Sequence, residues 1–170
     1  TPLTASLLKD LCDKAYDQNE FATFLGGPEV GAAFTQLQFD HLIYTGGNVV
    51  AKHVYNSASK NLVPCTLELG GKSPVIVSKT ADMKTTAKRI MFGKTLNAGQ
   101  ICLAPDYVVV HKDKKDEFIK ETKEAVSEYY PNIKNNDDYT SIINQAHYER
   151  LNDLLDDAIQ KGANVEPINP

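Results

Sequence analysis

The chain has 170 residues, 42% hydrophobic and 24% charged with no Trp, a composition typical of a globular protein. Its 18 Lys and Arg against 22 Asp and Glu give a formal net charge of −4 at pH 7, which argues against a nucleic-acid partner because phosphate binding needs a concentrated basic face. No uncharged run approaches the ~20 apolar residues of a membrane span, so no membrane partner is expected either.

The cysteines indicate a reducing compartment, because Cys12, Cys65 and Cys102 are too few and too scattered for a disulfide framework or a zinc site. No cluster of His, Cys or carboxylates has the spacing of metal ligands, so no metal is expected. No charged-then-apolar signal sequence opens the chain. The expected location is therefore the cytoplasm.

Helix and strand patterns alternate along the chain, which is typical of βαβ units and a mostly parallel sheet. Thr4 is expected to cap a first helix that runs to Ala15, and Pro28 to begin a second. A third helix is expected from about Asn48 to Lys60. The strands predicted in this half are Phe21–Leu25, His41–Tyr44 and Pro64–Leu69.

All three predicted strands run into paired glycines, and in open parallel sheets such turns lie at the carboxyl edge, where ligands bind. The pairs are Gly26-Gly27, Gly46-Gly47 and Gly70-Gly71. At the second pair, a helix start follows the turn and could place backbone N–H groups at a phosphate. The segment lacks the G-x-G-x-x-G pattern, so an ordinary strand-to-helix turn is the alternative.

After Lys72 the pattern restarts, which predicts a boundary near residues 70–75. Asp82 is expected to cap a helix that reaches roughly Asn97. Strands are expected at 74–77 and 106–111, and amphipathic helices with solvated charged faces near 113–130 and 145–161.

Cys102 is the sharpest candidate for a catalytic residue. It lies just past a predicted helix and between Gly99 and Pro105, where the backbone is expected to turn sharply. A thiol in such a turn can be a nucleophile when its surroundings stabilise the thiolate. The alternative is a small buried hydrophobe, which is how Cys12 and Cys65 are interpreted.

Glu68 is the second candidate, because it lies between two leucines at the end of an apolar strand. We expect its carboxylate to be partly desolvated there and suited to act as a general base. The alternative is an edge glutamate that forms an ion pair with Lys72.

A thiol hydrolase that pairs Cys102 with a histidine is a competing function. Such partners meet in space rather than in sequence, so spacing does not exclude the pairing. The four dispersed candidates are His41, His53, His111 and His147.

Two segments together resemble the two signatures of the aldehyde dehydrogenase superfamily, in the right order and at the right separation. They are Leu67–Pro74, which reads LELGGKSP, and Gly99–Cys102, which reads GQIC. Two more, Phe39–Gly46 and Ala104–Tyr107, look like the class 3 branch of the family. Gly26–Gly31 and Asp138–Asn144 are most similar to the bacterial coniferyl aldehyde dehydrogenases. The resemblance covers essentially the whole chain.

The resemblance implies an α/β fold of the aldehyde dehydrogenase type. Residues 1–72 would form the C-terminal part of the NAD-binding domain, with a partial Rossmann-type parallel sheet, and residues 73–170 the N-terminal part of the α/β catalytic domain. The implied reaction oxidises a small-molecule aldehyde, with coniferaldehyde-like aromatics as one candidate, to the carboxylic acid with NAD or NADP. At full length, the resemblance implies a homodimer.

The resemblance also implies roles for individual residues. Cys102 would attack the aldehyde carbonyl to give a thiohemiacetal, and loss of hydride to the nicotinamide would leave a thioester. Glu68 would activate the water that hydrolyses it, and the Cys102 backbone N–H would supply half of an oxyanion hole. Two residues would lie beside the nicotinamide, Leu69 and Gly70. Three would lie beneath the pyrophosphate, Thr45, Gly46 and Gly47.

The chain departs from the family pattern in two ways. Gly47 stands where a hydroxyl residue is common and Ala51 where a second glycine is common, so a side-chain contact to phosphate is lost and looser cofactor binding is expected. Family members are also considerably longer. The asparagine that completes the oxyanion hole and the lysine at the adenosine ribose normally precede the position of Thr1, and the glutamate at the nicotinamide ribose lies beyond Pro170.

This chain alone is therefore expected to be inactive and to leave apolar surface uncovered. A function of a different class stays open beside the enzyme: a non-catalytic module of the same fold that binds a nucleotide weakly or mediates assembly.

Overall fold

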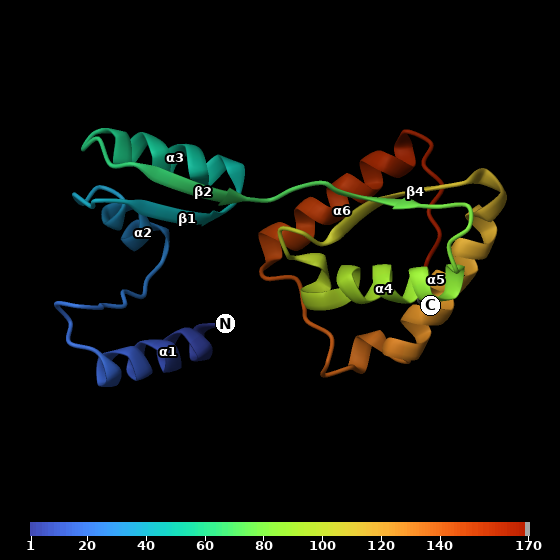
Figure 1. Ribbon diagram of the computed structural model, residues 1–170, viewed down its shortest axis with the longest axis horizontal. Helices are drawn as coiled ribbons and strands as arrows, with labels where there is room; N and C mark the ends of the chain where they lie inside the picture. The colour runs from blue at the N-terminus through green and yellow to red at the C-terminus, as the bar shows by residue number, and fades with distance from the viewer. Residues whose placement is uncertain (169–170) are drawn as a thin grey trace. The chain divides into compact units, whose positions relative to one another are not determined.

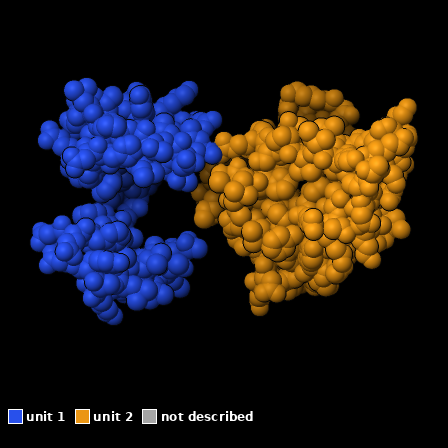
Figure 2. Space-filling model, viewed as in Figure 1, with its two compact units in different colours: residues 1–69 blue, residues 70–170 orange. Residues whose placement is uncertain are grey.

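The computed structural model describes residues 1–168, and the chain divides into two compact units, Thr1–Leu69 and Gly70–Pro170 (Figure 2). The first unit holds α1 (Pro2–Ala15), α2 (Pro28–Phe34), β1 (Leu42–Gly46), α3 (Asn48–Ser59) and β2 (Cys65–Leu69). The second holds β3 (Ser73–Val77), α4 (Met83–Thr95), β4 (Pro105–Val110), α5 (Lys115–Tyr129) and α6 (Gln145–Gln160), with 3-10 turns at Leu96–Gly99, Lys112–Lys114 and Ile133–Asn135.

The first unit is built on a βαβ crossover, in which α3 connects the parallel strands β1 and β2 (Figure 1). Ala51, Val54 and Ala58 lie on one face of α3, since residues three and four positions apart share a face, and all three are buried. The core formed there joins Val54 and Ala58 to Leu42 and Val63. The opposite face of the strand pair is bare, with Ile43 71% exposed.

Two expectations for the first unit are wrong. The segment Phe21–Leu25 is irregular rather than a buried strand, and Phe24 is 68% exposed. A strand depends on hydrogen bonds from a neighbour, and no strand of the described residues pairs with this segment. The first helix also starts earlier than predicted, with Thr1 rather than Thr4 at the N-cap, because Pro2 is pre-organised for the first helical position.

The second unit packs α4 and α5 against one face of the parallel pair β3–β4 (Figure 1). The buried residues of this core are Val77, Met83, Ile90, Met91, Ala125 and Val126. The predicted cap is confirmed, since the Asp82 carboxylate accepts a hydrogen bond of 2.9 Å from the Thr85 N–H.

Several helical surfaces have no cover among the residues that the structure describes. No residue of α1 or α6 is buried, and large apolar side chains such as Leu8 and Leu154 are more than half exposed. The expectation of uncovered apolar surface is confirmed. Among the helices described, none has the length and apolarity to cross a membrane.

Candidate active site

The glycine turn after β1 forms an open helix start. A side chain on Gly46 would collide with the Tyr44 hydroxyl, whereas a Cβ on Gly47 would meet no atom within 4 Å. Gly47 is also the N-cap of α3 and offers no side chain to its first-turn N–H groups, which a helix cannot satisfy internally. Exposed donors at the positive end of a helix dipole fit a phosphate group.

The carboxyl edge of β1–β2 brings four predicted site residues together. Thr45 lies opposite Glu68, and Gly46 lies opposite Leu69, in the parallel register. The Thr45 and Glu68 side chains share the exposed face of the pair, while Leu67 and Leu69 lie on the half-buried face. The glycine turn and the proposed general base therefore occupy one edge.

The expected desolvation of Glu68 is wrong for this chain, because Glu68 is exposed. The reason is strand alternation: neighbours in sequence point to opposite faces, so the two flanking leucines do not cover the carboxylate. The alternative, an ion pair of Glu68 with Lys72, stays a prediction. The Lys72 amine lies 3.2 Å from the Asp106 carboxylate, within the second unit.

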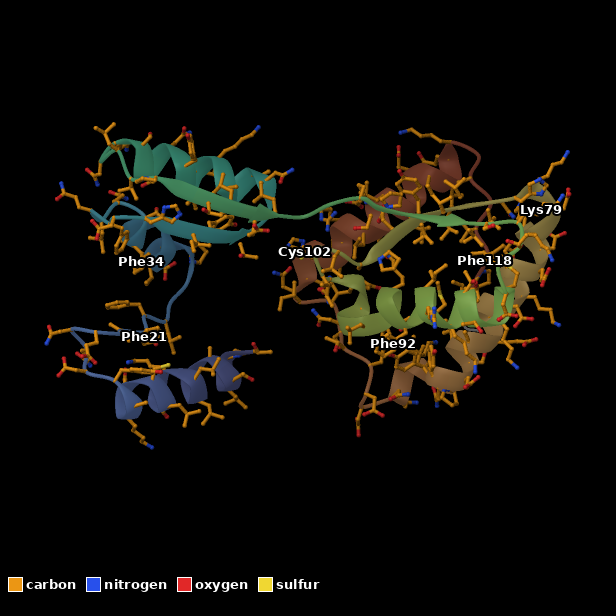
Figure 3. All side chains as sticks on the ribbon, viewed as in Figure 1. Phe21, Phe34, Lys79, Phe92, Cys102 and Phe118 are labelled. Carbon is orange, nitrogen blue, oxygen red and sulfur yellow. The ribbon has the colours of Figure 1, made fainter. Side chains whose placement is uncertain are left out.

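Cys102 lies in a loop that a left-handed turn produces. Helix α4 ends at Thr95, two residues before the predicted Asn97, because Asn97, Ala98 and Gly99 all have positive φ, at 51°, 53° and 74°. The loop then returns to the amino end of β4 and leaves Cys102 exposed (Figure 3). The interpretation of Cys102 as a buried hydrophobe is therefore wrong, and Cys12 and Cys65 are only partly buried.

Gly71 connects this loop to the glycine pair that follows β2. A Cβ on Gly71 would lie 3.6 Å from the Cys102 carbonyl oxygen, so the backbone of the Cys102 loop passes beside Gly71. Gly71 and Cys102 are thus neighbours within the second unit, and Gly70 directly precedes Gly71 in the sequence.

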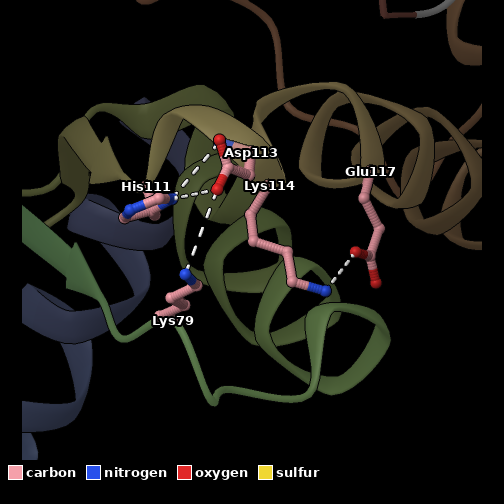
Figure 4. A network of polar contacts seen from close by, with 5 residues as sticks. All are labelled: Lys79, His111, Asp113, Lys114 and Glu117. Carbon is pink, nitrogen blue, oxygen red and sulfur yellow. Dashed lines mark hydrogen bonds and ion pairs between the residues drawn. The ribbon is translucent and has the colours of Figure 1, made fainter.

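His111 does not pair with Cys102. The two residues flank opposite ends of β4, whose six residues span roughly 20 Å at about 3.3 Å each. His111 Nδ1 instead accepts a 3.3 Å hydrogen bond from the Asp113 N–H and lies 3.4 Å from the Asp113 carboxylate, which also lies 4.0 Å from the Lys79 amine (Figure 4). Figure 3 shows Lys79 and Cys102 at opposite ends of the unit.

A cavity of about 760 Å³ in the first unit lies between residues 21–36 and the β1–α3 segment. None of the predicted catalytic or cofactor-binding residues lines it, although His53, one of the four histidines considered as a partner of Cys102, does. Within residues 1–168, no three His, Cys, Asp or Glu side chains gather as metal ligands would.

Gln100 is a residue that the sequence reasoning missed. Its side chain hydrogen-bonds the left-handed turn and the backbone of residues 141–143. The available signal was its place between Gly99 and Cys102 in the GQIC segment.

A family model described as "Aldehyde dehydrogenase family" matches residues 1–167. A probable coniferyl aldehyde dehydrogenase of Caulobacter vibrioides is 58% identical over all 170 residues. Aldehyde dehydrogenase family 3 member A2 of Rattus norvegicus is 38% identical over 90% of the chain. The solved structure of Staphylococcus aureus AldH in a substrate-bound state is similar over 94% of the chain, with 44% identity and a TM-score of 0.84. The chain spans 35%, 32% and 35% of these three proteins, respectively.

Proposed function

Since that family model covers residues 1–167, the chain belongs to the aldehyde dehydrogenase family, and we propose that the protein oxidises an aldehyde to its carboxylic acid with NAD or NADP. The observation that carries the proposal is Cys102, an exposed thiol on a sharply turned loop inside the GQIC segment. In this proposal residues 1–72 belong to the NAD-binding domain and residues 73–170 to the catalytic domain.

The first chemical step belongs to Cys102. Its thiolate sulfur forms a bond to the aldehyde carbon, and the carbonyl oxygen takes the electron pair and becomes an oxyanion. The backbone N–H of Cys102 donates a hydrogen bond to that oxyanion and supplies one half of its stabilisation. Bound NAD or NADP would supply the acceptor for the hydride that leaves this carbon, and Cys102 would then carry a thioester.

The second step belongs to Glu68. Its carboxylate takes a proton from a water molecule, whose oxygen attacks the thioester carbonyl, and Cys102 leaves as the thiolate. The exposed position of Glu68 at the end of β2 leaves it open to water. The products are the free enzyme and the carboxylic acid.

The residues that would hold the cofactor pyrophosphate are Thr45, Gly46 and Gly47, where the uncapped start of α3 presents backbone donors. Leu69 and Gly70 would lie beside the nicotinamide. Gly47 stands where family members commonly have a hydroxyl residue, and the open space beside it allows that residue to be restored. Gly47→Ser adds a hydroxyl donor without a steric collision, so we expect NAD to bind more tightly in calorimetry, whereas Gly46→Ser meets Tyr44 and should weaken binding.

The proposed substrate is an aromatic aldehyde of the coniferaldehyde type, on the strength of the 58% identity to a probable coniferyl aldehyde dehydrogenase. A homodimeric assembly and a cytoplasmic location stay predictions from the family resemblance and the cysteine usage.

The test is NADH or NADPH production by the full-length protein with coniferaldehyde. Cys102→Ser should abolish it, and Cys65→Ser, a change to a partly buried thiol outside the site, should retain it. Glu68→Gln should give one burst of NADH per site and then stall, because the thioester forms but is not hydrolysed. NAD binding without any turnover would support the non-catalytic module instead. The 170-residue chain alone should be inactive, and turnover of benzaldehyde at an ordinary enzyme rate would contradict that expectation.

A further inference from the structure

The Gln100 side chain uses all of its hydrogen-bonding groups but one acceptor lone pair. Its Nε2 donates to the Asn97 carbonyl at 3.0 Å and to the Ser141 carbonyl at 3.1 Å. Its Oε1 accepts from the Ile143 N–H at 2.9 Å. A glutamine amide has two N–H donors, so both donors have a partner here.

The two bonds to residues 141 and 143 have the pattern of a parallel β-bridge. A residue in a parallel ladder donates to the carbonyl before its partner and accepts from the N–H after it. Ser141 and Ile143 flank Ile142 in this way. The amide of Gln100 therefore substitutes for a strand peptide and joins the Cys102 loop to a segment 41 to 43 residues away.

The turn that Gln100 closes is held in an unfavourable conformation. Asn97 and Ala98 adopt left-handed angles that cost an L-residue free energy, so the surroundings must fix them. The Asn97 carbonyl accepts from the Gln100 backbone N–H at 3.1 Å as well as from its side chain. Gln100 thus holds the turn from both backbone and side chain.

The segment on the other side of this link is itself anchored. The Tyr139 ring packs edge-on against Tyr130, with centroids 5.0 Å apart. The Tyr130 hydroxyl lies 3.4 Å from Thr95 Oγ1 at the end of α4. Tyr139 therefore attaches the start of the segment 139–143 to the helical core, and Gln100 links the Cys102 loop to this segment.

We propose that Gln100 is a positioning residue for Cys102, which lies two residues further along the same loop. Both residues are exposed, so apolar burial contributes little to holding them, and the amide hydrogen bonds carry that task. The link fixes the direction of the thiol and of the Cys102 N–H toward the aldehyde. This inference has two halves. The mechanical half, that Gln100 holds the Cys102 loop in place, is independent of the proposed function. The catalytic half, that this positioning supports catalysis by Cys102, rests on the proposed function.

The mechanical half is tested in the full-length protein without any turnover. Gln100→Met keeps the side-chain length and removes every side-chain hydrogen bond, while the backbone bond to the Asn97 carbonyl stays possible. The matched control is Gln145→Met, because the exposed Gln145 side chain hydrogen-bonds Glu149 within α6 and no other residue of the range 1–168. We expect the Ile143 amide to exchange its hydrogen at least tenfold faster in Gln100→Met, and Cys102 to change its alkylation rate with iodoacetamide. The control should match the wild type, and unchanged exchange in Gln100→Met would overturn the proposal.

The catalytic half is tested by kcat per titrated active site. Gln100→Met should lower kcat roughly tenfold or more at nearly constant KM, since small misplacements of reacting groups cost that much. A merely structural role would instead reduce the fraction of titratable sites and leave kcat per site unchanged, which would contradict the proposal.

Gln100→Glu supplies the second variant in case Gln100→Met does not fold. A protonated Glu can again donate to the Ser141 carbonyl and accept from the Ile143 N–H, whereas the carboxylate is repelled by that carbonyl. Its kcat relative to wild type should therefore rise as the pH is lowered, and a flat ratio would count against the link. If the wild type oxidises no aldehyde, the proposed function fails, while the exchange and alkylation measurements still decide the role of Gln100.

Discussion

Gly99 is the residue whose replacement the loop geometry tolerates least. Its φ of +74° lies in the left-handed region, and a Cβ there would lie 3.0 Å from the Lys94 carbonyl oxygen. The backbone angle alone costs an L-residue ~1–2 kcal/mol, and the close contact adds to it. We expect Gly99→Ala to lower the free energy of unfolding by about 2–3 kcal/mol in urea titrations.

Gly162 provides the matched control for this substitution. Its φ is +88°, but a Cβ there meets no atom within 4 Å. Gly162→Ala should therefore cost only the ~1–2 kcal/mol of the backbone angle. Equal losses in the two variants would mean that the contact with the Lys94 carbonyl contributes nothing.

At the residue scale, the motifs predict which residues carry the chemistry but not how exposed those residues are. The LELGGKSP and GQIC segments pick out Glu68 and Cys102 from sequence alone. The exposure of Glu68 could have been predicted, because strand alternation turns its two leucine neighbours to the other face. The left-handed angles at Asn97 and Ala98 could not be predicted, since neither residue type requires them.

Among the elements, α4 and α6 differ in how much of their apolar face is covered. Ile90 of α4 is 7% exposed in the second core, whereas Ile159 of α6 is 49% exposed. We expect Ile90→Ala to cost ~2–5 kcal/mol of unfolding free energy and Ile159→Ala about 0.5 kcal/mol or less in the same chain. A comparable loss at Ile159, measured by urea denaturation, would mean that α6 is buried in solution.

The Asp82 cap of α4 should make the free energy of unfolding depend on pH in the acidic range. A hydrogen bond from Thr85 lowers the pKa of Asp82, so the native state binds a proton less readily than the unfolded state. This contribution is fully present above the unfolded-state pKa and is lost as the pH falls through the lowered native pKa. Asp82→Asn keeps the acceptor without the charge, so its urea midpoint should fall less steeply than that of the wild type on acidification. Urea midpoints that fall equally steeply with pH in the wild type and in Asp82→Asn would contradict this role of Asp82.

The sequence predicted helix starts well, because their signals are local. The Asp82 cap, Pro28 at the start of α2 and the glycine turn before α3 all mark real helix starts. The segment Phe21–Leu25 failed because its apolar pattern needs a neighbouring strand, and no local signal supplies one. Local propensity therefore suggests which segments can form strands, and pairing with a neighbouring strand determines which of them do.

At the scale of the whole molecule, the predicted aldehyde dehydrogenase-type α/β fold is confirmed by the similarity to the Staphylococcus aureus structure. Length alone suggests one domain, but the chain forms two compact units with separate cores. The sequence does not show how small the first core is, since most apolar residues of α1 and of residues 21–37 lie exposed.

The unequal cores predict that the two units unfold separately. The first core holds four buried residues, Leu42, Val54, Ala58 and Val63, whereas the second holds six. Less buried apolar surface gives less stabilisation. We therefore expect hydrogen exchange in urea to release the amides of α3 at a lower concentration than those of α4.

Two valine truncations test this order, because Val54 and Val126 are both buried, at 6% and 3% exposure, and lie in different cores. Each Val→Ala change should lower the local unfolding free energy of its own unit by ~1–3 kcal/mol. The urea midpoint of that unit should fall, and the midpoint of the other unit should stay the same. A single transition for α3 and α4 that either truncation shifts equally would mean that the two cores unfold as one cooperative body.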